Sequence, residues 1–570
     1  MTLKEQWNQK AWPRILLALG LNAAFLFIML RFFAPMWETN DDLFISKFFD
    51  GQMAHKTMYA PFINICLAWL MKTVYTAFGD GFNWYSCAQY LLLYMGFTAI
   101  TWVLLRRYRL GPALVMTAVL LGAFGTDCYL SMNFSKPAAL GTVGGMALML
   151  HALRNAEGRV LKTPLTLGLL LALSGYVWRF EEFGVCALLM AALCLAGLFA
   201  LGKENRQLAL GERVKQYLRF LAPFMLLAVL AAGLFVFDLA LWRRPAVGGF
   251  RDFNDTRSAF LDFQTPDYAQ MPEAYDSVGM DESFVYLMKQ WSFYDTERFN
   301  QKNLETLIEA RDKLVPRRTP GECLGVFLNE CLMGFTGDRP FWGFAFMLML
   351  WLAAGKRRAG TWLTLAYLGG MFALIYLLMI YADRYLANRV DMGLFLAMAA
   401  VLSFLMDEQR LKDEKLLLTA VLLLSLFVTW RTNRDWCRYD SHNRIEDKSA
   451  EKAAVERLLA DEGQLYLVKV WAVDHTLYTP LETPPAHYAE RLLLLGGWSM
   501  GHPEIEKVLD RWGLVNPYHD MVNRADICLI DHDIDRTLAY LRFSYYPKAA
   551  AELIEPVSGE TGYQIYRITG

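Results

Sequence analysis

The sequence lacks the short motifs that mark several enzyme classes. It contains no phosphate-binding G-x-x-x-x-G-K-[ST] loop and no H-E-x-x-H, which argues against ATPase and zinc metalloprotease functions. Its nine cysteines show no C-x-x-C or similar metal-ligand spacing. Neither sign of charge is in excess, with 56 basic and 57 acidic residues, so nothing in the composition points to a nucleic-acid partner.

A cleavable signal peptide is also lacking. The first apolar run, 15–30, follows Lys4, Lys10 and Arg14, but bulky residues rather than a small-residue cleavage site come after it. We therefore expect a retained signal-anchor helix with a cytoplasmic N-terminus. Apolar residues, by contrast, are abundant: they make up 55% of the 570 residues and gather in long runs with few charges.

These runs predict an α-helical polytopic membrane protein, because about 20 apolar residues in a helix cross a lipid bilayer and shorter runs can do so when their flanks snorkel. We expect about eleven spans, at 12–34, 86–105, 111–130, 137–153, 163–178, 183–201, 220–242, 340–354, 361–381, 390–406 and 416–430.

Basic residues orient these spans in the plasma membrane. With the N-terminus inside, every internal connection carries Arg or Lys, as the positive-inside rule requires. The apolar segment 61–78 is different, because it carries Asn64 and Lys72. Counting it as a span would invert every later loop, so we expect an interfacial helix on the outer face. The internal basic connections are 106–109, 154–162, 203–219, 356–358 and 410–415.

Two domains follow from this topology. Residues 1–430 form the membrane domain, with outer loops at 35–85 and 243–339. Residues 431–570 form a small soluble α/β domain outside the cell, because helical and strand patterns alternate there. Four cysteines, Cys323, Cys331, Cys437 and Cys528, would lie outside and could form disulfides. In the tail we expect helices at 450–459 and 534–541, and strands at 464–470, 526–530 and 563–568.

An acidic pair, Asp41-Asp42, follows the first span directly on its outer side. Two close carboxylates repel, so one tends to hold its proton or to seek a cation or donor. That property suits a base that deprotonates a hydroxyl. The alternative is a solvated loop with a helix N-cap at Asn40 or Asp41.

Arginines at the outer face are a second signal, because they run against the positive-inside bias. Arg384 and Arg389 flank the start of the tenth span and could clamp a lipid phosphate by paired hydrogen bonds. The alternative is an ion pair with a nearby carboxylate. Further polar residues at the outer ends or in the second outer loop are weaker candidates for binding substrate: Arg179, Glu181, Glu182, Asp127, Lys136, Asn254 and Arg257.

The placement of the acidic pair, followed by His55-Lys56 and by Tyr59-Ala60-Pro61-Phe62, resembles the GT-C membrane glycosyltransferases, such as protein O-mannosyltransferases and aminoarabinose transferases. The resemblance implies a GT-C-like fold and a polyprenyl-phosphate-linked sugar as donor. It also implies an aspartate base after the first span, which is Asp41 here, with Asp42 as second choice.

The expected activity is therefore an inverting sugar transfer at the outer face, with Lys56, Arg384 and Arg389 holding the donor phosphate. The sequence does not identify the sugar. It is compatible with a glycan, a teichoic acid or a protein as the acceptor. The residues predict no metal site, and a need for Mg²⁺ stays open because a monophosphate donor does not demand it.

Two other functions remain as alternatives. A transporter or lipid flippase would show repeats and mid-span charges, whereas the charges here gather at the outer ends. A polymerase or ligase of lipid-linked cell-envelope glycans would use similar chemistry with two lipid-linked substrates.

Overall fold

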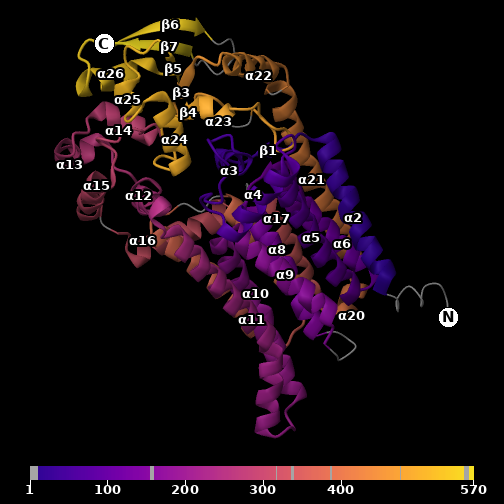
Figure 1. Ribbon diagram of the computed structural model, residues 1–570. Helices are drawn as coiled ribbons and strands as arrows, with labels where there is room; N and C mark the ends of the chain where they lie inside the picture. The colour runs from indigo at the N-terminus through magenta and orange to yellow at the C-terminus, as the bar shows by residue number, and fades with distance from the viewer. Residues whose placement is uncertain are drawn as a thin grey trace.

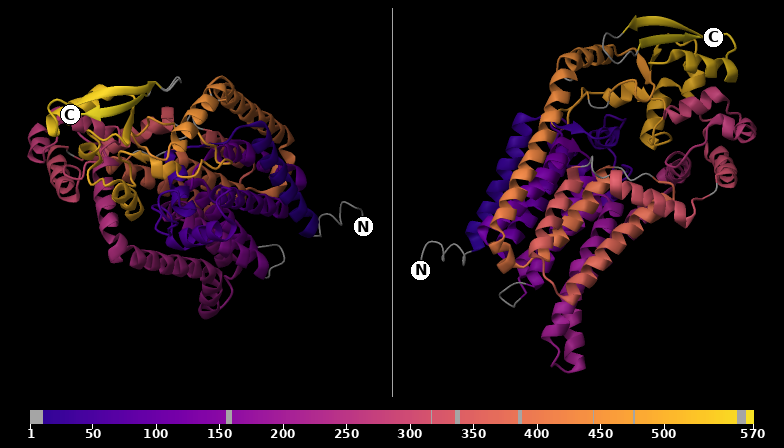
Figure 2. Two further views of the ribbon diagram at one scale, coloured as in Figure 1. Left: turned by 45° about the horizontal axis from the view of Figure 1, so that its top comes forward. Right: turned by 180° about the vertical axis from the view of Figure 1, so that it is seen from behind.

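The computed structural model describes residues 11–154, 160–315, 317–334, 339–384, 388–443, 445–474, 477–556 and 564–570. A bundle of long helices carries a small α/β domain at one end, and the chain's N-terminal helix begins at the other (Figure 1). Seen from behind, the last long helix of the bundle continues toward that domain (Figure 2). The protein is thus a helical polytopic membrane protein with a C-terminal α/β part, as the sequence predicts.

Every predicted span contains a helix. Among the described residues, six helices are both long and apolar enough to cross a membrane, while the rest are shorter or more polar, so the number eleven stays a prediction. The bundle consists of α2 (Ala11–Phe32), α5 (Trp84–Arg107), α6 (Leu110–Leu120) with η1 (Leu121–Gly125) and α7 (Thr126–Leu130), α8 (Ser135–Leu153), α9 (Lys162–Trp178), α10 (Phe180–Glu204), α11 (Leu210–Trp242), α17 (Arg339–Ala354), α18 (Ala359–Tyr381), α19 (Asn388–Phe404) and α21 (Lys415–Asn443).

Glycines let α8 pack closely against its neighbours. A Cβ at Gly144 would lie 2.8 Å from the Gly96 carbonyl oxygen in α5, and one at Gly145 would lie 2.6 Å from the Gly168 carbonyl oxygen in α9. Such close backbone approach is the usual way in which membrane helices associate, because lipid gives no hydrophobic drive between them. The close packing of α8 also holds Phe134, the residue just before its N-terminus, which lines the candidate site described below.

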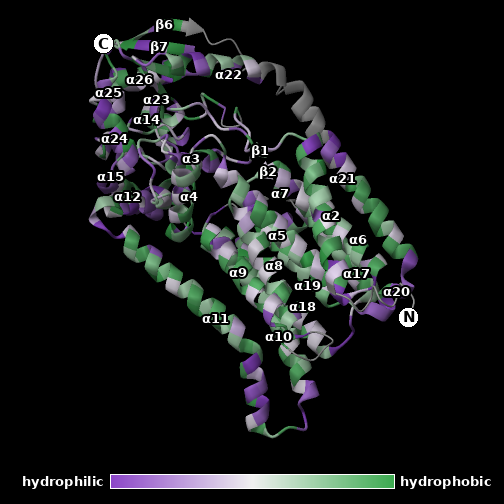
Figure 3. Cartoon of the chain, turned by 45° about the vertical axis from the view of Figure 1, so that its right-hand side comes forward, coloured by the Kyte–Doolittle hydropathy of each residue, from purple (hydrophilic) through white to green (hydrophobic). Residues whose placement is uncertain are grey.

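The basic connections gather at the end of the bundle opposite the α/β domain. There Arg14 Nη1 donates to the Arg106 carbonyl oxygen at 3.4 Å, Arg107 Nη2 to the Phe404 carbonyl oxygen at 2.5 Å, and Arg109 lies 4.0 Å from Glu408. Figure 3 shows hydrophilic residues at this end and hydrophobic residues along the helices above it. This common placement agrees with the alternation that oriented the spans.

The segment predicted as the first outer loop, called the first outer segment below, begins with β1 (Met36–Trp37), which pairs in parallel with β2 (Ser131–Met132). It continues into α3 (Asn40–Asp50) and α4 (Ile65–Phe78). Asp238 of α11 accepts a hydrogen bond from the Ile65 backbone N–H at 2.8 Å, which satisfies a free donor at the start of α4. At 14 residues, α4 is shorter than a span.

The second outer segment lies beside the α/β domain (Figure 1). It carries the helices α12 (Pro245–Leu261), η2 (Tyr268–Gln270), α13 (Pro272–Ser277), α14 (Glu282–Lys289), α15 (Gln301–Leu314) and α16 (Pro320–Asn329), then η3 (Glu330–Gly334).

The C-terminal domain begins where α21 and α22 (Ile445–Ala460) lead away from the bundle, so α21 passes residue 430 without a break. Three predicted strands and both predicted helices are present, with ends shifted by a few residues. Two strands, Leu492–Leu494 and Ala550–Pro556, and three helices, Tyr488–Arg491, Pro503–Trp512 and Pro517–Asp520, were not predicted. Within the described residues the sheet has the order β4-β3-β5-β7-β6, with β4, β3 and β5 parallel. Its elements are β3 (Leu465–Val468), α23 (Tyr488–Arg491), β4 (Leu492–Leu494), α24 (Pro503–Trp512), α25 (Pro517–Asp520), β5 (Ile527–Asp531), α26 (Ile534–Ser544), β6 (Ala550–Pro556) and β7 (Gln564–Thr569).

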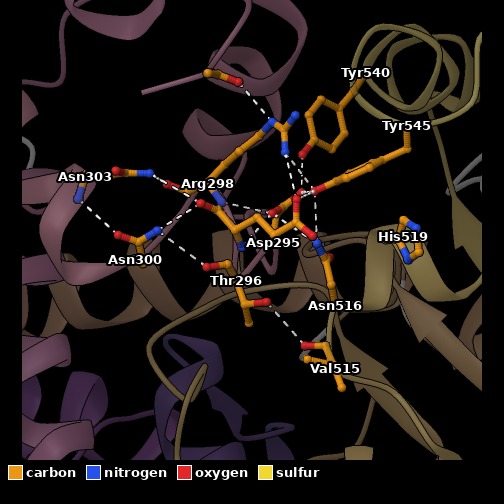
Figure 4. A network of polar contacts seen from close by, with 12 residues as sticks. Asp295, Thr296, Arg298, Asn300, Asn303, Val515, Asn516, His519, Tyr540 and Tyr545 are labelled. Carbon is orange, nitrogen blue, oxygen red and sulfur yellow. Dashed lines mark hydrogen bonds and ion pairs between the residues drawn. The ribbon is translucent and has the colours of Figure 1, made fainter. Parts of the chain in front are cut away.

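A buried carboxylate ties the second outer segment to this domain. Asp295 accepts hydrogen bonds from the hydroxyls of Tyr540 and Tyr545, the latter at 2.6 Å, and from Asn516 Nδ2 at 3.2 Å (Figure 4). Arg298 Nη1 donates to the Tyr545 hydroxyl at 2.8 Å. A buried hydrogen-bond network of this kind holds its partners in one arrangement, so the outer segment and the domain form one wall.

Cysteines contribute no cross-link where the structure describes them. Cys323, Cys331 and Cys528 are free thiols, and the side chain of Cys437 lies outside the described residues.

Candidate functional site

A cavity of about 320 Å³ lies between the outer end of the bundle, the second outer segment and the C-terminal domain. All three parts of the chain contribute residues to its wall, so the cavity forms only where they pack together. Aromatic rings alternate in it with a few charged groups, as in many small-molecule sites. The lining residues are Thr39, Asn40, Asp41, Phe44, Phe62, Phe134, Arg179, Arg257, Asp262, Trp291, Arg389, Val470, Trp471, Leu494, Gly497, Trp498 and Ser499.

Asp41 lies in the first turn of α3, where its negative charge is favoured by the helix dipole. Its Oδ2 accepts a hydrogen bond from the Thr39 hydroxyl at 3.1 Å. Its Oδ1 accepts one from the Trp498 indole N–H at 2.9 Å. The carboxylate is therefore held in a fixed direction at the cavity wall by one neighbour in sequence and one residue of the C-terminal domain.

Asp42 has different surroundings, because it is fully buried behind the cavity wall. Its Oδ1 accepts hydrogen bonds from the Tyr85 hydroxyl at 2.9 Å and from Gln89 Nε2 at 2.7 Å. The Phe134 backbone N–H lies 3.3 Å from Oδ2. Burial, opposed by these hydrogen bonds and assisted by the charge of Asp41, raises the pKa of Asp42 to about 7. Asp42 thus connects α3 to α5 and to the residues before α8.

The raised pKa of the Asp42 carboxyl makes the stability of the folded protein depend on pH. Its pKa in the folded protein, about 7, lies above its ordinary value of 3.8. The stability that it contributes is therefore complete below its ordinary pKa and is lost as the pH rises through about 7. We expect the melting temperature of the wild type to fall relative to that of Asp42→Asn between about pH 5 and about pH 8, because asparagine does not titrate there. Thermal melting in detergent measures this; parallel curves for the two proteins would contradict it.

Three arginines reach the cavity from separate elements. Arg257 of α12 is 2% exposed; its Nε donates to Asn254 Oδ1 at 2.9 Å, and its Nη1 lies 3.4 Å from Asp262. Arg179, between α9 and α10, donates to the Ser135 hydroxyl at 2.6 Å.

Arg389, in the first turn of α19, is the third of these arginines. Its Nε is buried without a hydrogen-bond partner in the described part of the chain. Three arginines and two carboxylates, Asp41 and Asp262, line the cavity, so the excess of positive charge favours an anion there.

The other two predicted phosphate ligands lie apart from this wall. Arg384 lies 3.8 Å from Asp262 and stacks on the Phe263 ring. Lys56 lies 2.6 Å from Asp80 and donates to the Tyr75 carbonyl oxygen at 3.0 Å. Of the predicted donor-phosphate set, the structure therefore brings Arg389 alone to the cavity.

The weaker candidates divide in the same way. Asn254 orients Arg257 and so acts one residue behind the wall. Lys136 is buried in a pair with Asp127 at 2.9 Å and with Glu38 at 2.8 Å, an arrangement in which each buried charge is compensated.

The two glutamates of the first turn of α10 point to different places. Glu181 is exposed and lies 3.6 Å from Arg179. Glu182 is buried in the bundle, where its carboxylate occupies the space that a Cβ at Gly393 of α19 would need.

A metal site is not evident in the described residues, since no three His, Cys, Asp or Glu side chains come together there. The acidic pair does not chelate, because Asp41 and Asp42 bind different partners. We therefore assign no residue to Mg²⁺.

The C-terminal domain contributes to the site in a way that sequence reasoning missed. Val470 and Trp471 follow strand β3, and Gly497, Trp498 and Ser499 follow β4; all line the cavity. The sequence signal that could have located them is the tryptophan in each loop after a predicted or short apolar run. Without the sheet order, nothing placed those loops beside Asp41.

Comparisons with known proteins give a fold likeness only. No family model matches the chain, and no curated protein matches its sequence. Among solved structures, the chain is similar to ArnT from Cupriavidus metallidurans bound to undecaprenyl phosphate, with a TM-score of 0.41, 12% identity and 97% of both chains covered. The apo form of that protein gives the same TM-score and coverage at 11% identity. At this TM-score and identity the likeness supports no functional argument, so any function has to be argued from the geometry of the cavity.

Proposed function

We propose that this protein is a membrane glycosyltransferase of the GT-C type that takes its sugar from a polyprenyl-phosphate-linked donor at the outer face of the membrane. The observation that carries the proposal is the cavity itself. Asp41, a carboxylate held by two hydrogen bonds, lines this cavity together with arginines from the α9–α10 connection, α12 and α19, at one end of a bundle that contains helices long and apolar enough to cross a membrane. Base and phosphate ligands are the two groups that such a transfer needs.

The chemistry assigned to these groups is a single displacement. Asp41 takes the proton of the acceptor hydroxyl as its oxygen bonds to the anomeric carbon, and the bond from that carbon to the phosphate oxygen breaks. The charge that develops on the leaving polyprenyl phosphate is stabilised by Arg389, Arg257 and Arg179. Because the acceptor attacks opposite the leaving group, the sugar is transferred with inversion.

Asp42 supports this step without taking the proton. It is buried behind α3 and holds the first turn of that helix to α5, so it fixes the direction in which Asp41 points. Asp41, the first choice from the sequence, therefore remains the proposed base.

Incubation with a panel of donors tests the proposal. The reconstituted protein would be given undecaprenyl-phosphate-linked hexoses and pentoses together with a crude cell-envelope acceptor fraction, and release of free undecaprenyl phosphate would be followed by mass spectrometry. Release with one or more donors supports the proposal; none with any donor, from protein that still binds undecaprenyl phosphate, contradicts it.

We further propose that the C-terminal domain is extracytoplasmic and the N-terminus cytoplasmic. In a background without native cysteines, Val515→Cys, which is 75% exposed in this domain, should react with an impermeant thiol reagent in intact cells. Gln207→Cys, in the basic connection after α10, should react only after lysis. The reverse pattern would overturn the orientation.

A further inference from the structure

Three aromatic residues of the cavity have a backbone conformation that bulky side chains rarely adopt. Phe62, Trp291 and Trp471 have φ angles of 68°, 61° and 73°, and all three line the cavity. A side chain in this left-handed region strains the backbone, and such outliers persist where the surrounding structure holds them for a purpose. Glycine would remove the strain at each position, so the rings themselves need an explanation.

The Trp471 side chain is only partly packed in the domain. Half of it is exposed, whereas Val470 beside it is 2% exposed and packs inside. Trp291 is half-buried and carries the Arg257 guanidinium over its ring at 5.4 Å. The two indoles thus present ring surface to the cavity from the C-terminal domain and from the second outer segment.

The position of Trp471 follows a general rule of α/β sheets. In such sheets, ligands bind beyond the carboxyl ends of parallel strands, at the point where the strand order changes direction. Here the chain runs from β3 to β4 on one side and then returns to β5 on the other. Trp471 follows β3, at that point.

Backbone contacts fix the two tryptophans relative to each other. The Gly497 N–H donates to the Trp291 carbonyl oxygen at 3.1 Å, and the Tyr294 N–H to the Leu495 carbonyl oxygen at 2.9 Å. The Val470 N–H donates to the Ser292 hydroxyl at 3.0 Å. At Gly496 a Cβ would lie 2.0 Å from the Trp291 carbonyl oxygen, so only glycine allows this approach.

Trp471 and two of the three proposed phosphate ligands belong to different layers of the wall, whereas the third, Arg257, lies over the Trp291 ring. Arg389 and Arg179 belong to the bundle helices, where a lipid-linked donor arrives. Trp471 belongs to the C-terminal domain, and Trp498 of the same domain holds Asp41 between the two layers. A donor bound through its phosphate to Arg389 and Arg179 leaves the Trp471 side of the cavity for the second substrate.

We propose that Trp291 and Trp471 form a carbohydrate-binding subsite for the acceptor, so that the acceptor is a glycan with a pyranose ring. The flat apolar face of a pyranose matches an indole ring, while its hydroxyls need a few polar groups at the edge, such as the Ser499 hydroxyl in the same wall. A polyol phosphate or an extended peptide offers no such face. This assignment rests on the proposed transferase function and names its acceptor class.

The test measures sugar binding directly. Saturation-transfer NMR with methyl pyranosides of glucose, galactose, mannose and N-acetylglucosamine would compare the wild type, Trp471→Gly, Trp471→Phe and Phe543→Ala. Phe543 is a matched control because it is exposed in the same domain, away from the cavity. We expect Trp471→Gly to weaken binding of at least one pyranoside by about three- to tenfold, the scale of a lost aromatic stacking contact.

Two further readouts separate this role from a merely structural one. Trp471→Gly should still unfold in one cooperative transition, because relief of the backbone strain at that position offsets part of the loss of ring contacts. Trp471→Phe should retain part of the binding, and Phe543→Ala should retain all of it.

Several outcomes overturn the assignment: no pyranoside binds the wild type, or Trp471→Gly binds as the wild type does. A third is that Trp471→Gly weakens binding of a polyprenyl-phosphate pyranose as much as that of the free pyranoside, which would give the ring to the donor. Binding of sugar-free polyprenyl phosphate is measured alongside. If that binding is normal while pyranoside binding is absent, the acceptor assignment fails and the proposed transferase function does not.

Discussion

Replacing Asp41 with Asn is expected to lower the rate of sugar transfer by about two orders of magnitude or more, the usual scale for a lost general base. Asparagine keeps the size of the side chain and an oxygen that can accept from the Trp498 indole, so the cavity should keep its shape. It removes only the group that takes the acceptor proton. Turnover would be measured with a donor from the panel, and donor binding should stay within about threefold of the wild type.

Two variants serve as controls for this expectation. Trp498→Phe keeps a ring but loses the N–H that holds Asp41 Oδ1 at 2.9 Å, and it should lower turnover by about tenfold, the scale of one hydrogen bond to a charged group. Asp42→Asn should affect turnover less than Asp41→Asn, since Asp42 lies behind the wall. Near-normal turnover in Asp41→Asn would show that the mechanism assigned here is wrong.

The second large effect concerns Arg389. Its replacement by Ala should weaken binding of polyprenyl phosphate by about 10- to 100-fold, because one or two charge-assisted hydrogen bonds to the phosphate are lost. Arg389→Lys should recover part of that loss, since the charge remains but the planar fork does not. Binding would be measured with purified protein in detergent at fixed salt.

Arg384 provides the comparison. It lies five residues earlier and carries the same charge, but its guanidinium lies 3.8 Å from Asp262 and 42% of its side chain is exposed. Solvent screens such a group, so Arg384→Ala should weaken binding much less than Arg389→Ala. Equal losses in the two variants would mean that general positive charge, and not a specific contact, attracts the lipid.

The helices of the bundle could be predicted because lipid imposes a simple rule on sequence: a span has to be apolar over its length and must bond its backbone internally. The parts of the C-terminal domain that were missed obey no such rule. Strand β4 (Leu492–Leu494) has only three residues, too few for a recognisable pattern, and its pairing with β3 is a long-range contact.

In the candidate site, too, a residue fixed by its distance from a span was predictable and a residue brought in by a long-range contact was not. Asp41 was predictable because it follows the first span at a fixed depth, which sequence distance alone determines. Its partner Trp498 lies 457 residues away, and no local pattern links the two.

Lys56 shows what local reasoning cannot supply. Its charge and its place after the acidic pair suggested a phosphate ligand, whereas the fold turns it toward Asp80 and the end of α4. Whether a charged side chain at the outer face meets a ligand or a carboxylate depends on tertiary contacts.

The most direct test of the proposed function is product analysis of a single transfer. A polyprenyl-phosphate donor carrying an isotopically labelled sugar would be incubated with the protein and an acceptor glycan, and both products would be quantified. The proposed mechanism predicts equal amounts of free polyprenyl phosphate and glycosylated acceptor, with the anomeric configuration inverted. Release of the lipid phosphate without glycosylated product, or a product that retains the donor's configuration, would contradict it.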